Sequence, residues 1–191
     1  MEYLSVSRLP IVDEQNADPE VEPIFAQIRH ELEIPFVPNF FKMTAANSVP
    51  VLAGTWELFR NVYLHSSLPM SLKALTLFAV SSANRCKYCS AVHQATCKVV
   101  GIDEDTLTAV TGELEQLSPR RIKVIVQFAL KCASDSGNLV EADYNRVREE
   151  GITNEELVEI IALAGLANYL DTLADAMKVD IDSAFVQMLK D

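Results

Sequence analysis

The chain has 191 residues and a formal net charge of −11, and 49% of its residues are hydrophobic. This length suits one domain, or two small halves packed together, and the apolar content excludes a disordered chain. The negative charge argues against nucleic acid and anionic membrane surfaces as partners, because both require a basic face on the protein.

The N-terminal segment predicts neither a leader nor a membrane anchor. Residues 1–20 contain no basic stretch followed by an apolar run, so no secretory leader is expected. The longest apolar runs are about a dozen residues and are interrupted, so we expect no membrane span. These features predict a cytoplasmic protein, in which cysteines stay reduced unless they take part in redox chemistry.

Helical periodicity begins in the first third of the chain. Apolar residues spaced four apart, from Ile24 to Leu32, predict one apolar stripe of a helix over 21–33. Prolines follow and end this helix. Ser48 then predicts the N-cap of a further helix over 51–64.

The centre of the chain carries two more predicted helices. Residues 71–83 are apolar nearly all round, which is typical of a buried helix. Residues 86–100 predict the next helix, and Gly101 ends it as a C-cap. Residues 123–130 resemble a strand when taken alone, but the repeat described below favours a helix there.

The last third of the chain is dominated by one long predicted helix. Thr153 and Glu156 have the spacing of a capping box, which predicts a helix start and a helix over 154–177. The sequence therefore predicts an all-α helical bundle. We expect one domain over 1–191, with an N-terminal extension over about 1–34.

A helical unit occurs twice at an offset of 50 residues, over about 68–110 and 118–160. Pro69 aligns with Pro119 and two glycines align in the same way, and such residues fix the ends of helices. We therefore predict two related helical units packed on each other. The second unit lacks the cysteines of the first, so the scaffold itself does not require them.

The candidate reactive groups lie in the stretch NRCKYCSAVHQ, residues 84–94. Cys86 and Cys89 are three apart at a predicted helix start, where exposed N–H groups and the helix dipole favour a thiolate. His93 is one turn further along the same face and can accept the Cys89 proton. This set offers a nucleophilic thiol, a base and a resolving thiol, which suits peroxide reduction through a sulfenic acid and a disulfide.

Other roles for the cysteine pair stay open from the residues alone. A serine follows the second cysteine, which excludes haem attachment because that motif needs a histidine there. Cys86, Cys89 and His93 offer three ligands for zinc, although no second cysteine pair completes a structural site, and an iron–sulfur cluster needs more thiolates nearby. Burial as small core residues is the last alternative, and we expect it for Cys97 and Cys132.

The pattern Asn-x-Cys-x-Tyr-Cys-x-x-x-His occupies Asn84, Cys86, Tyr88, Cys89 and His93. With this pattern, and with IPFVPNFFKM and LAGLANYLDTLADAM, the chain resembles the alkylhydroperoxidase D-like proteins of the carboxymuconolactone decarboxylase superfamily, closest to their peroxidase-related branch. The resemblance runs roughly from residue 35 to residue 177. It implies an all-helical homo-oligomer that reduces hydroperoxides through the cysteine pair, without a metal or haem cofactor.

The resemblance also implies a role for each reactive side chain. Cys89 is expected to be the peroxidatic thiol, and Cys86 the resolving thiol that faces a dithiol, thioredoxin or lipoyl-type electron donor. His93 is expected to belong to a proton relay. The hydroxyl of Tyr88 can bind substrate or a neighbouring carboxylate, and simple packing of its ring is the alternative.

One position departs from the family pattern. The family carries a glutamate twelve residues before the first cysteine, and this chain has Ala74 there. We expect Glu57, on the preceding helix, to supply the missing carboxylate, and a place on the solvent face is its alternative role. The departure keeps two other functions open: a protein disulfide reductase or adaptor, and a helical oligomer that senses oxidation through its thiols.

Overall fold

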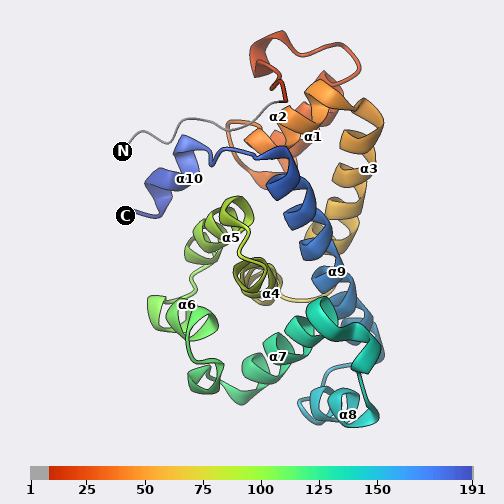
Figure 1. The fold of residues 1–191 in the computed structure, drawn as a ribbon, viewed down its shortest axis with the longest axis vertical. Helices are drawn as coiled ribbons and strands as arrows, with labels where there is room; N and C mark the ends of the chain where they lie inside the picture. The colour runs from red at the N-terminus through yellow and green to blue at the C-terminus, as the bar shows by residue number, and fades with distance from the viewer. Residues whose placement is uncertain (1–8, 191) are drawn as a thin grey trace.

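The computed structural model of the protein describes residues 9–190, and it is all-helical over that range, as the sequence predicts (Figure 1). Its α-helices are α1 (Glu22–Leu32), α2 (Asn39–Asn47), α3 (Val49–Phe59), α4 (Met70–Ala83), α5 (Lys87–Val99), α6 (Glu104–Thr111), α7 (Arg120–Asp135), α8 (Glu141–Glu149), α9 (Asn154–Met177) and α10 (Ser183–Met188). No strand occurs between residues 9 and 190. The first eight residues of the predicted N-terminal extension lie outside the described range.

Several helix ends agree with the predicted caps. The Ser48 side chain accepts a hydrogen bond from the N–H of Val51 at the start of α3. Thr153 and Glu156 form the capping box that opens α9. Gly101 follows α5 with a φ of 83°, a left-handed conformation that glycine adopts without steric cost. Each of these caps depends on residues close together in the chain, which is why the sequence predicts them.

The two helical units place their elements at matching positions. Met70 opens α4 and Arg120 opens α7, and a proline precedes each helix. The left-handed Gly101 and Gly151 precede the starts of α6 and α9 in the same way. Residues 123–130 lie inside α7, so the prediction of a helix in place of a strand is confirmed.

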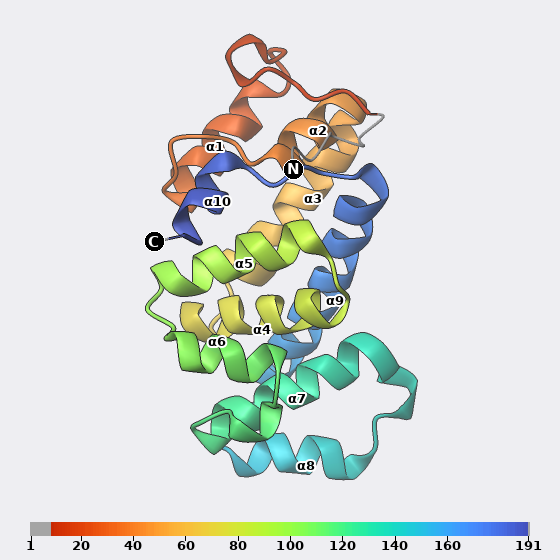
Figure 2. The same cartoon turned by 60° about the vertical axis from the view of Figure 1, so that its left-hand side comes forward.

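Helices α4 and α9 form the centre of the molecule. Helix α4 is buried nearly all round and packs against α5, α7 and α9. Helices α1 to α3 cover one end of this centre, and α7 with α8 covers the other (Figures 1 and 2). Helix α5 returns antiparallel to α4 after a tight turn, so that its N-terminal end meets the C-terminal half of α9.

Helix α9 is long and apolar enough to cross a membrane by length and composition, and it is the only such helix among residues 9–190. Half of its most apolar window is buried inside the fold, and it packs between α4 and α7. Apolar side chains of a helix that is buried by its own protein face neighbouring helices. These contacts indicate the central helix of a globular bundle.

Candidate active site

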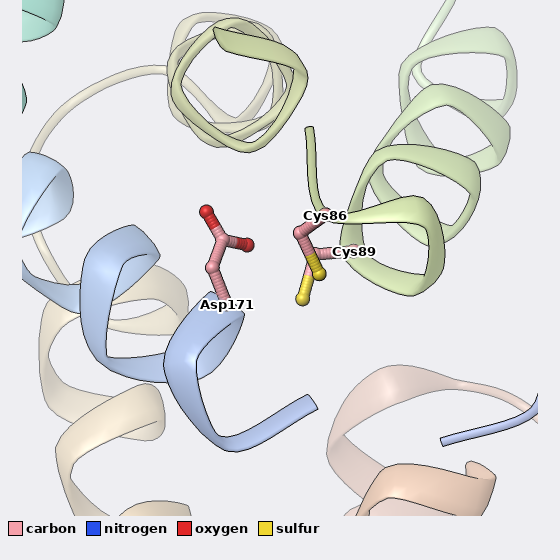
Figure 3. Close-up of side chains that lie close together, drawn as sticks. All are labelled: Cys86, Cys89 and Asp171. Carbon is pink, nitrogen blue, oxygen red and sulfur yellow. The ribbon is translucent and has the colours of Figure 1, made fainter. Parts of the chain in front are cut away.

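A tight turn between α4 and α5 sets the position of both cysteines. Arg85 adopts a left-handed conformation with a φ of 62°, and the N–H of Cys86 donates to the carbonyl of Ser81 over 3.1 Å. Cys86 is thereby the N-cap of α5, and Cys89 lies in its first turn. The predicted helix start is confirmed, and the two sulfur atoms lie side by side (Figure 3).

A carboxylate from α9 completes the cluster at the cysteine pair. The sulfur atoms of Cys86 and Cys89 and one carboxylate oxygen of Asp171 all lie within 4.8 Å of one another. In Figure 3 the carboxylate points from α9 toward the two sulfurs. All three side chains are buried: Cys86 is 0% exposed, Cys89 is 3% exposed and Asp171 is 4% exposed. Because water is largely excluded, charges in this cluster interact strongly.

Two neutral side chains hold the Asp171 carboxylate in place. The hydroxyl of Ser81 donates to Oδ1 over 2.8 Å, and the amide of Asn84 donates to Oδ2 over 2.8 Å. The same amide donates to Asn168, whose own amide donates to the carbonyl of Ala133 in α7. The carboxylate is therefore fixed to the end of α4 that leads into the cysteine turn.

The surroundings of Asp171 and Cys89 raise the pKa of both groups. Burial raises the pKa of the Asp171 carboxyl, and hydrogen bonds from Asn84, Ser81 and Cys89 offset part of this rise. The pKa of the Cys89 thiol is also raised, by its hydrogen bond with Cys86, by burial and by the charge of Asp171. These surroundings oppose the predicted preference for a thiolate at the helix start, because the hydrogen bond with Cys86, burial and the charge of Asp171 all favour the protonated Cys89 thiol.

His93 lies on α5 one turn after Cys89, as predicted, and both side chains line the same cavity. Burial lowers the pKa of the imidazole to about 4, so the ring is neutral near pH 7. A neutral ring of this pKa is a weak base for a thiol. The third donor atom beside the two sulfurs also comes from Asp171, so His93 is not part of the cluster that the zinc alternative required.

Tyr88 is engaged by the fold through its hydroxyl group. The hydroxyl donates to the buried carboxylate of Asp182 over 3.1 Å and accepts from the N–H of Phe40 over 3.2 Å. The ring stacks on Phe40 with the two ring centres 6.3 Å apart. These contacts join α5 to the start of α2 and to the segment before α10. They match the predicted bond to a carboxylate. Both hydrogen bonds of the Tyr88 hydroxyl are therefore made within the fold.

Glu57 lies apart from the cysteine pair. Its side chain is 61% exposed and bonds to Arg60 and Asn61 on the surface of α3 and the turn after it. The expectation that it supplies the missing carboxylate is therefore corrected: Asp171 is the carboxylate at the thiols. Ala74 is fully buried in the packing between α4 and its neighbours.

An apolar cavity of about 440 Å³ opens beside Cys89 and His93. Aromatic and aliphatic side chains from α1, α2, α5, α9 and α10 form most of its wall, including Phe41, Val92 and Leu170. Cavities of this size and character accommodate small organic molecules. Of the two cysteines, only Cys89 lines it, so Cys89 is the thiol that a bound molecule meets.

Tyr63 is a further wall residue that the sequence did not single out. It belongs to a π-helical turn, Arg60–Leu64, which continues α3, and such turns are frequent at functional sites. Its hydroxyl is buried and has no hydrogen-bond partner among residues 9–190. Burial and the nearby Cys97 raise the pKa of this hydroxyl, so it stays protonated.

Asp171 and Tyr63 were not predicted as site residues, and they differ in the signal that they leave in the sequence. Asp171 falls on the apolar stripe of α9 between Leu170 and Ala174, and a carboxylate among buried positions is a sign of function or of a buried partner. Tyr63 leaves no such sign, because the π-helical turn shifts the side chains by about one residue from the α-helical pattern.

Residues 50–118 match the sequence model of the carboxymuconolactone decarboxylase family. A comparison with proteins of curated function gives no match. Among solved structures, the fold resembles an uncharacterized peroxidase-related protein of the alkylhydroperoxidase AhpD core from Ralstonia eutropha JMP134, with a TM-score of 0.83, 21% identity and 94% of each chain covered.

Two further structures have the same fold over nearly their whole length. A peroxidase-related protein from Silicibacter sp. TM1040 has a TM-score of 0.82 and 23% identity, and it covers 96% of this chain and 95% of its own. A variant of the debrominase Bmp8 in complex with 2,3,4-tribromopyrrole has a TM-score of 0.80 and 19% identity, with 96% of each chain covered. The predicted resemblance is confirmed: residues 50–118 match the carboxymuconolactone decarboxylase family, and the described chain has the alkylhydroperoxidase D-like fold of these peroxidase-related structures.

Proposed function

We propose that the protein is a thiol peroxidase that reduces organic hydroperoxides through Cys89 and Cys86. One observation carries this proposal: two thiols and a buried carboxylate meet beside an apolar cavity. Cys89 borders the cavity, so it is the thiol that attacks the substrate. Cys86 lies close enough to react with the oxidised Cys89.

Asp171 is the proton acceptor in this proposal. Its raised pKa makes it a stronger base than an exposed aspartate, and one of its carboxylate oxygens lies within 4.8 Å of the Cys89 sulfur. Transfer of the Cys89 proton to Asp171 produces the thiolate and neutralises the charge that opposes thiolate formation. His93, which is neutral, offers a ring N–H to the oxygen atoms of a hydroperoxide in the same cavity.

The reaction follows from these positions. The Cys89 thiolate attacks one oxygen of the hydroperoxide, the S–O bond forms as the O–O bond breaks, and the leaving alkoxide takes a proton to become an alcohol. The Cys86 thiol then attacks the sulfenic sulfur, which forms the disulfide and releases water. Two thiols and one hydroperoxide thus give one disulfide, one alcohol and one water.

The cavity supports an organic hydroperoxide over hydrogen peroxide. Burial of apolar substrate surface contributes about 25 cal/mol for each Å² removed from water, and hydrogen peroxide has no such surface to bury. The volume of about 440 Å³ suits an alkyl or aryl group of moderate size. We therefore place antioxidant defence against organic hydroperoxides first among the roles of this protein.

A dithiol donor is proposed to reduce the disulfide by thiol–disulfide exchange. Cys86 lines a second hollow, of about 450 Å³, which shares no lining residue with the first. The exposed side chains of Arg85 and Lys87 border this hollow. Their positive charge supports a thioredoxin or lipoyl-type donor that approaches with an acidic surface.

A homo-oligomer and a cytoplasmic location complete the proposal. Exposed apolar side chains on α9, namely Val158, Ile161 and Tyr169, support a contact between subunits. Reduced thiols suit a compartment in which glutathione or thioredoxin keeps cysteines reduced. Both statements are tested by the mass of the protein in solution and by its distribution among cell fractions.

Reductive dehalogenation is the second candidate function. The debrominase Bmp8 shares the fold, and a dithiol beside an apolar cavity also meets the needs of that reaction. A thiolate takes bromine from an aryl bromide, the carbanion is protonated, and the second thiol displaces bromide as the disulfide forms. The reductase and the oxidation sensor remain alternatives that need the same cysteines without rapid turnover.

One experiment separates these functions. The reduced protein is mixed with cumene hydroperoxide, hydrogen peroxide or tribromopyrrole, thiol loss is followed, and dihydrolipoamide is then supplied for turnover. We expect rapid turnover with cumene hydroperoxide, none with Cys89→Ser, and unchanged rates with Cys132→Ser, whose thiol lies apart on α7. Turnover with tribromopyrrole alone supports the dehalogenase, and disulfide exchange without substrate turnover supports the reductase.

A further inference from the structure

The cysteine pair and Asp171 form a donor set with the composition of a zinc site. Thiolate sulfur and carboxylate oxygen both bind Zn²⁺, and soft thiolates favour it over Mg²⁺ or Ca²⁺. With Zn–S bonds of about 2.3 Å and Zn–O bonds of about 2.0 to 2.2 Å, ligand atoms of a tetrahedral site lie about 3.4 to 3.8 Å apart. The three atoms here lie within 4.8 Å of one another, so movements of about 1 Å close the site.

The second layer around the cluster also suits a cation. Ser81 and Asn84 donate hydrogen bonds to the Asp171 carboxylate, which fixes its orientation as supporting side chains do in metal sites. Both of these donors are neutral side chains. No charged donor to Asp171 is found among residues 9–190, so a bound cation would be the positive charge of this buried cluster.

We propose that the reduced protein binds one Zn²⁺ ion through Cys86, Cys89 and Asp171, with the fourth position open to water or to a small ligand. Cys89 borders the apolar cavity and Cys86 borders the second hollow, and both provide a route for the ion. Binding displaces the thiol protons, because the ligands are thiolates. The oxidised pair offers no thiolate, so the disulfide form does not bind the ion.

Such a site makes zinc a reversible inhibitor of the cysteine pair. The ion occupies both thiolates and the carboxylate, so the reduced pair cannot react while zinc is bound. Metal binding itself needs only the three side chains and does not depend on the proposed peroxidase activity. The two proposals are therefore tested separately, binding by direct titration and activity by turnover.

The experiment is an anaerobic titration of the full-length reduced protein with Co²⁺, followed by displacement with Zn²⁺. We expect one Co²⁺ per chain, with a sulfur-to-cobalt charge-transfer band and the visible bands of a tetrahedral site, and loss of both on addition of one equivalent of Zn²⁺. Protein oxidised to the disulfide with diamide serves as the folded control and is expected to bind neither ion. Equal binding by reduced and oxidised protein overturns the proposal.

Three variants identify the ligands. Cys86→Ser removes one of the two thiolates, so we expect weaker binding and a charge-transfer band of about half its intensity or less, and Asp171→Asn, which removes a ligand, is expected to weaken binding at least about tenfold. Cys132→Ser is the matched control, because its thiol is not in the cluster, and it is expected to bind as the unaltered protein does. Circular dichroism checks that each variant is folded. No binding by the reduced protein, or full binding by folded Cys86→Ser, rejects the site.

Discussion

The amide nitrogen of Asn84 lies 2.8 Å from Oδ2 of Asp171, although 87 residues separate them in the chain. Asn84 belongs to the turn that leads into Cys86, so this hydrogen bond fixes the carboxylate to the segment that carries the cysteines. Ser81 holds the other oxygen in the same way. The thiols and the carboxylate therefore keep one arrangement as a unit.

Asp171→Asn tests whether this carboxylate accepts the Cys89 proton. Loss of the base is expected to slow thiol oxidation by cumene hydroperoxide about a hundredfold at pH 7, the usual size of a general-base effect. Loss of the negative charge also lowers the pKa of Cys89, because that charge raises it. The difference from the unaltered protein should therefore shrink at alkaline pH, where hydroxide removes the proton. Stopped-flow thiol oxidation across pH measures this.

Glu57→Gln is the matched control for that variant. Glu57 is exposed and bonded to Arg60 and Asn61, so its loss is expected to leave thiol oxidation unchanged. If the thiols of Asp171→Asn oxidise faster than those of the unaltered protein at every pH, the carboxylate only disfavours the thiolate through its negative charge and does not act as its base.

His93→Gln is expected to reduce the loss of folding stability that the protein shows as the pH falls. The folded pKa of His93 is about 4 and its usual value is 6.5, so the unfolded chain takes up the proton first as pH falls. Stability contributed by the neutral ring is therefore present above pH 6.5 and is lost between pH 6.5 and 4, by about 3 kcal/mol in total. Urea unfolding at pH 7 and pH 4.5 is the measurement. Equal losses in the variant and the unaltered protein contradict the assignment.

Tyr63→Phe is expected to stabilise the protein by about 1 kcal/mol, because the variant removes a buried hydroxyl without a hydrogen-bond partner. For a chain of this length the melting temperature should rise about 2 to 4 °C. Calorimetry gives the stability, and KM for cumene hydroperoxide gives the second readout. A raised KM together with a lowered melting temperature would indicate that the hydroxyl is engaged, contrary to this expectation.

Val92→Phe tests the substrate class. Val92 lines the cavity three residues after Cys89, so a larger ring there reduces the room for an organic group. We expect kcat/KM for cumene hydroperoxide to fall about tenfold or more, and that for hydrogen peroxide to stay within about twofold. Equal losses for both substrates would indicate damage to the cysteine pair itself.

The sequence predicts what depends on short stretches of chain. Ser48, Thr153 and Gly101 mark helix ends because each cap involves residues within one turn. The three-residue spacing of Cys86 and Cys89 likewise places both sulfurs together once the helix start is known. His93 reaches the same cavity by the same local rule.

The sequence does not predict what depends on how distant helices pack. Asp171 meets Cys89 only because α9 crosses the start of α5, and the raised pKa values of both groups come from burial that no local pattern reports. Glu57 is nearer in sequence and has the expected charge, but it faces water on α3. The fold class was therefore predictable, and the partner of the thiols was not.

Helix α9 has a consequence for the order in which the protein matures. A chain emerging from the ribosome exposes Cys86 and Cys89 well before Asp171 is synthesised, and α9 also supplies Asn168, which ties the turn to α7. The nascent cysteine pair therefore lacks both the Asp171 carboxylate and the cover that α9 gives to the thiols. The pair acquires both only when α9 docks, so newly made chains are the population in which these thiols are open to adventitious oxidation.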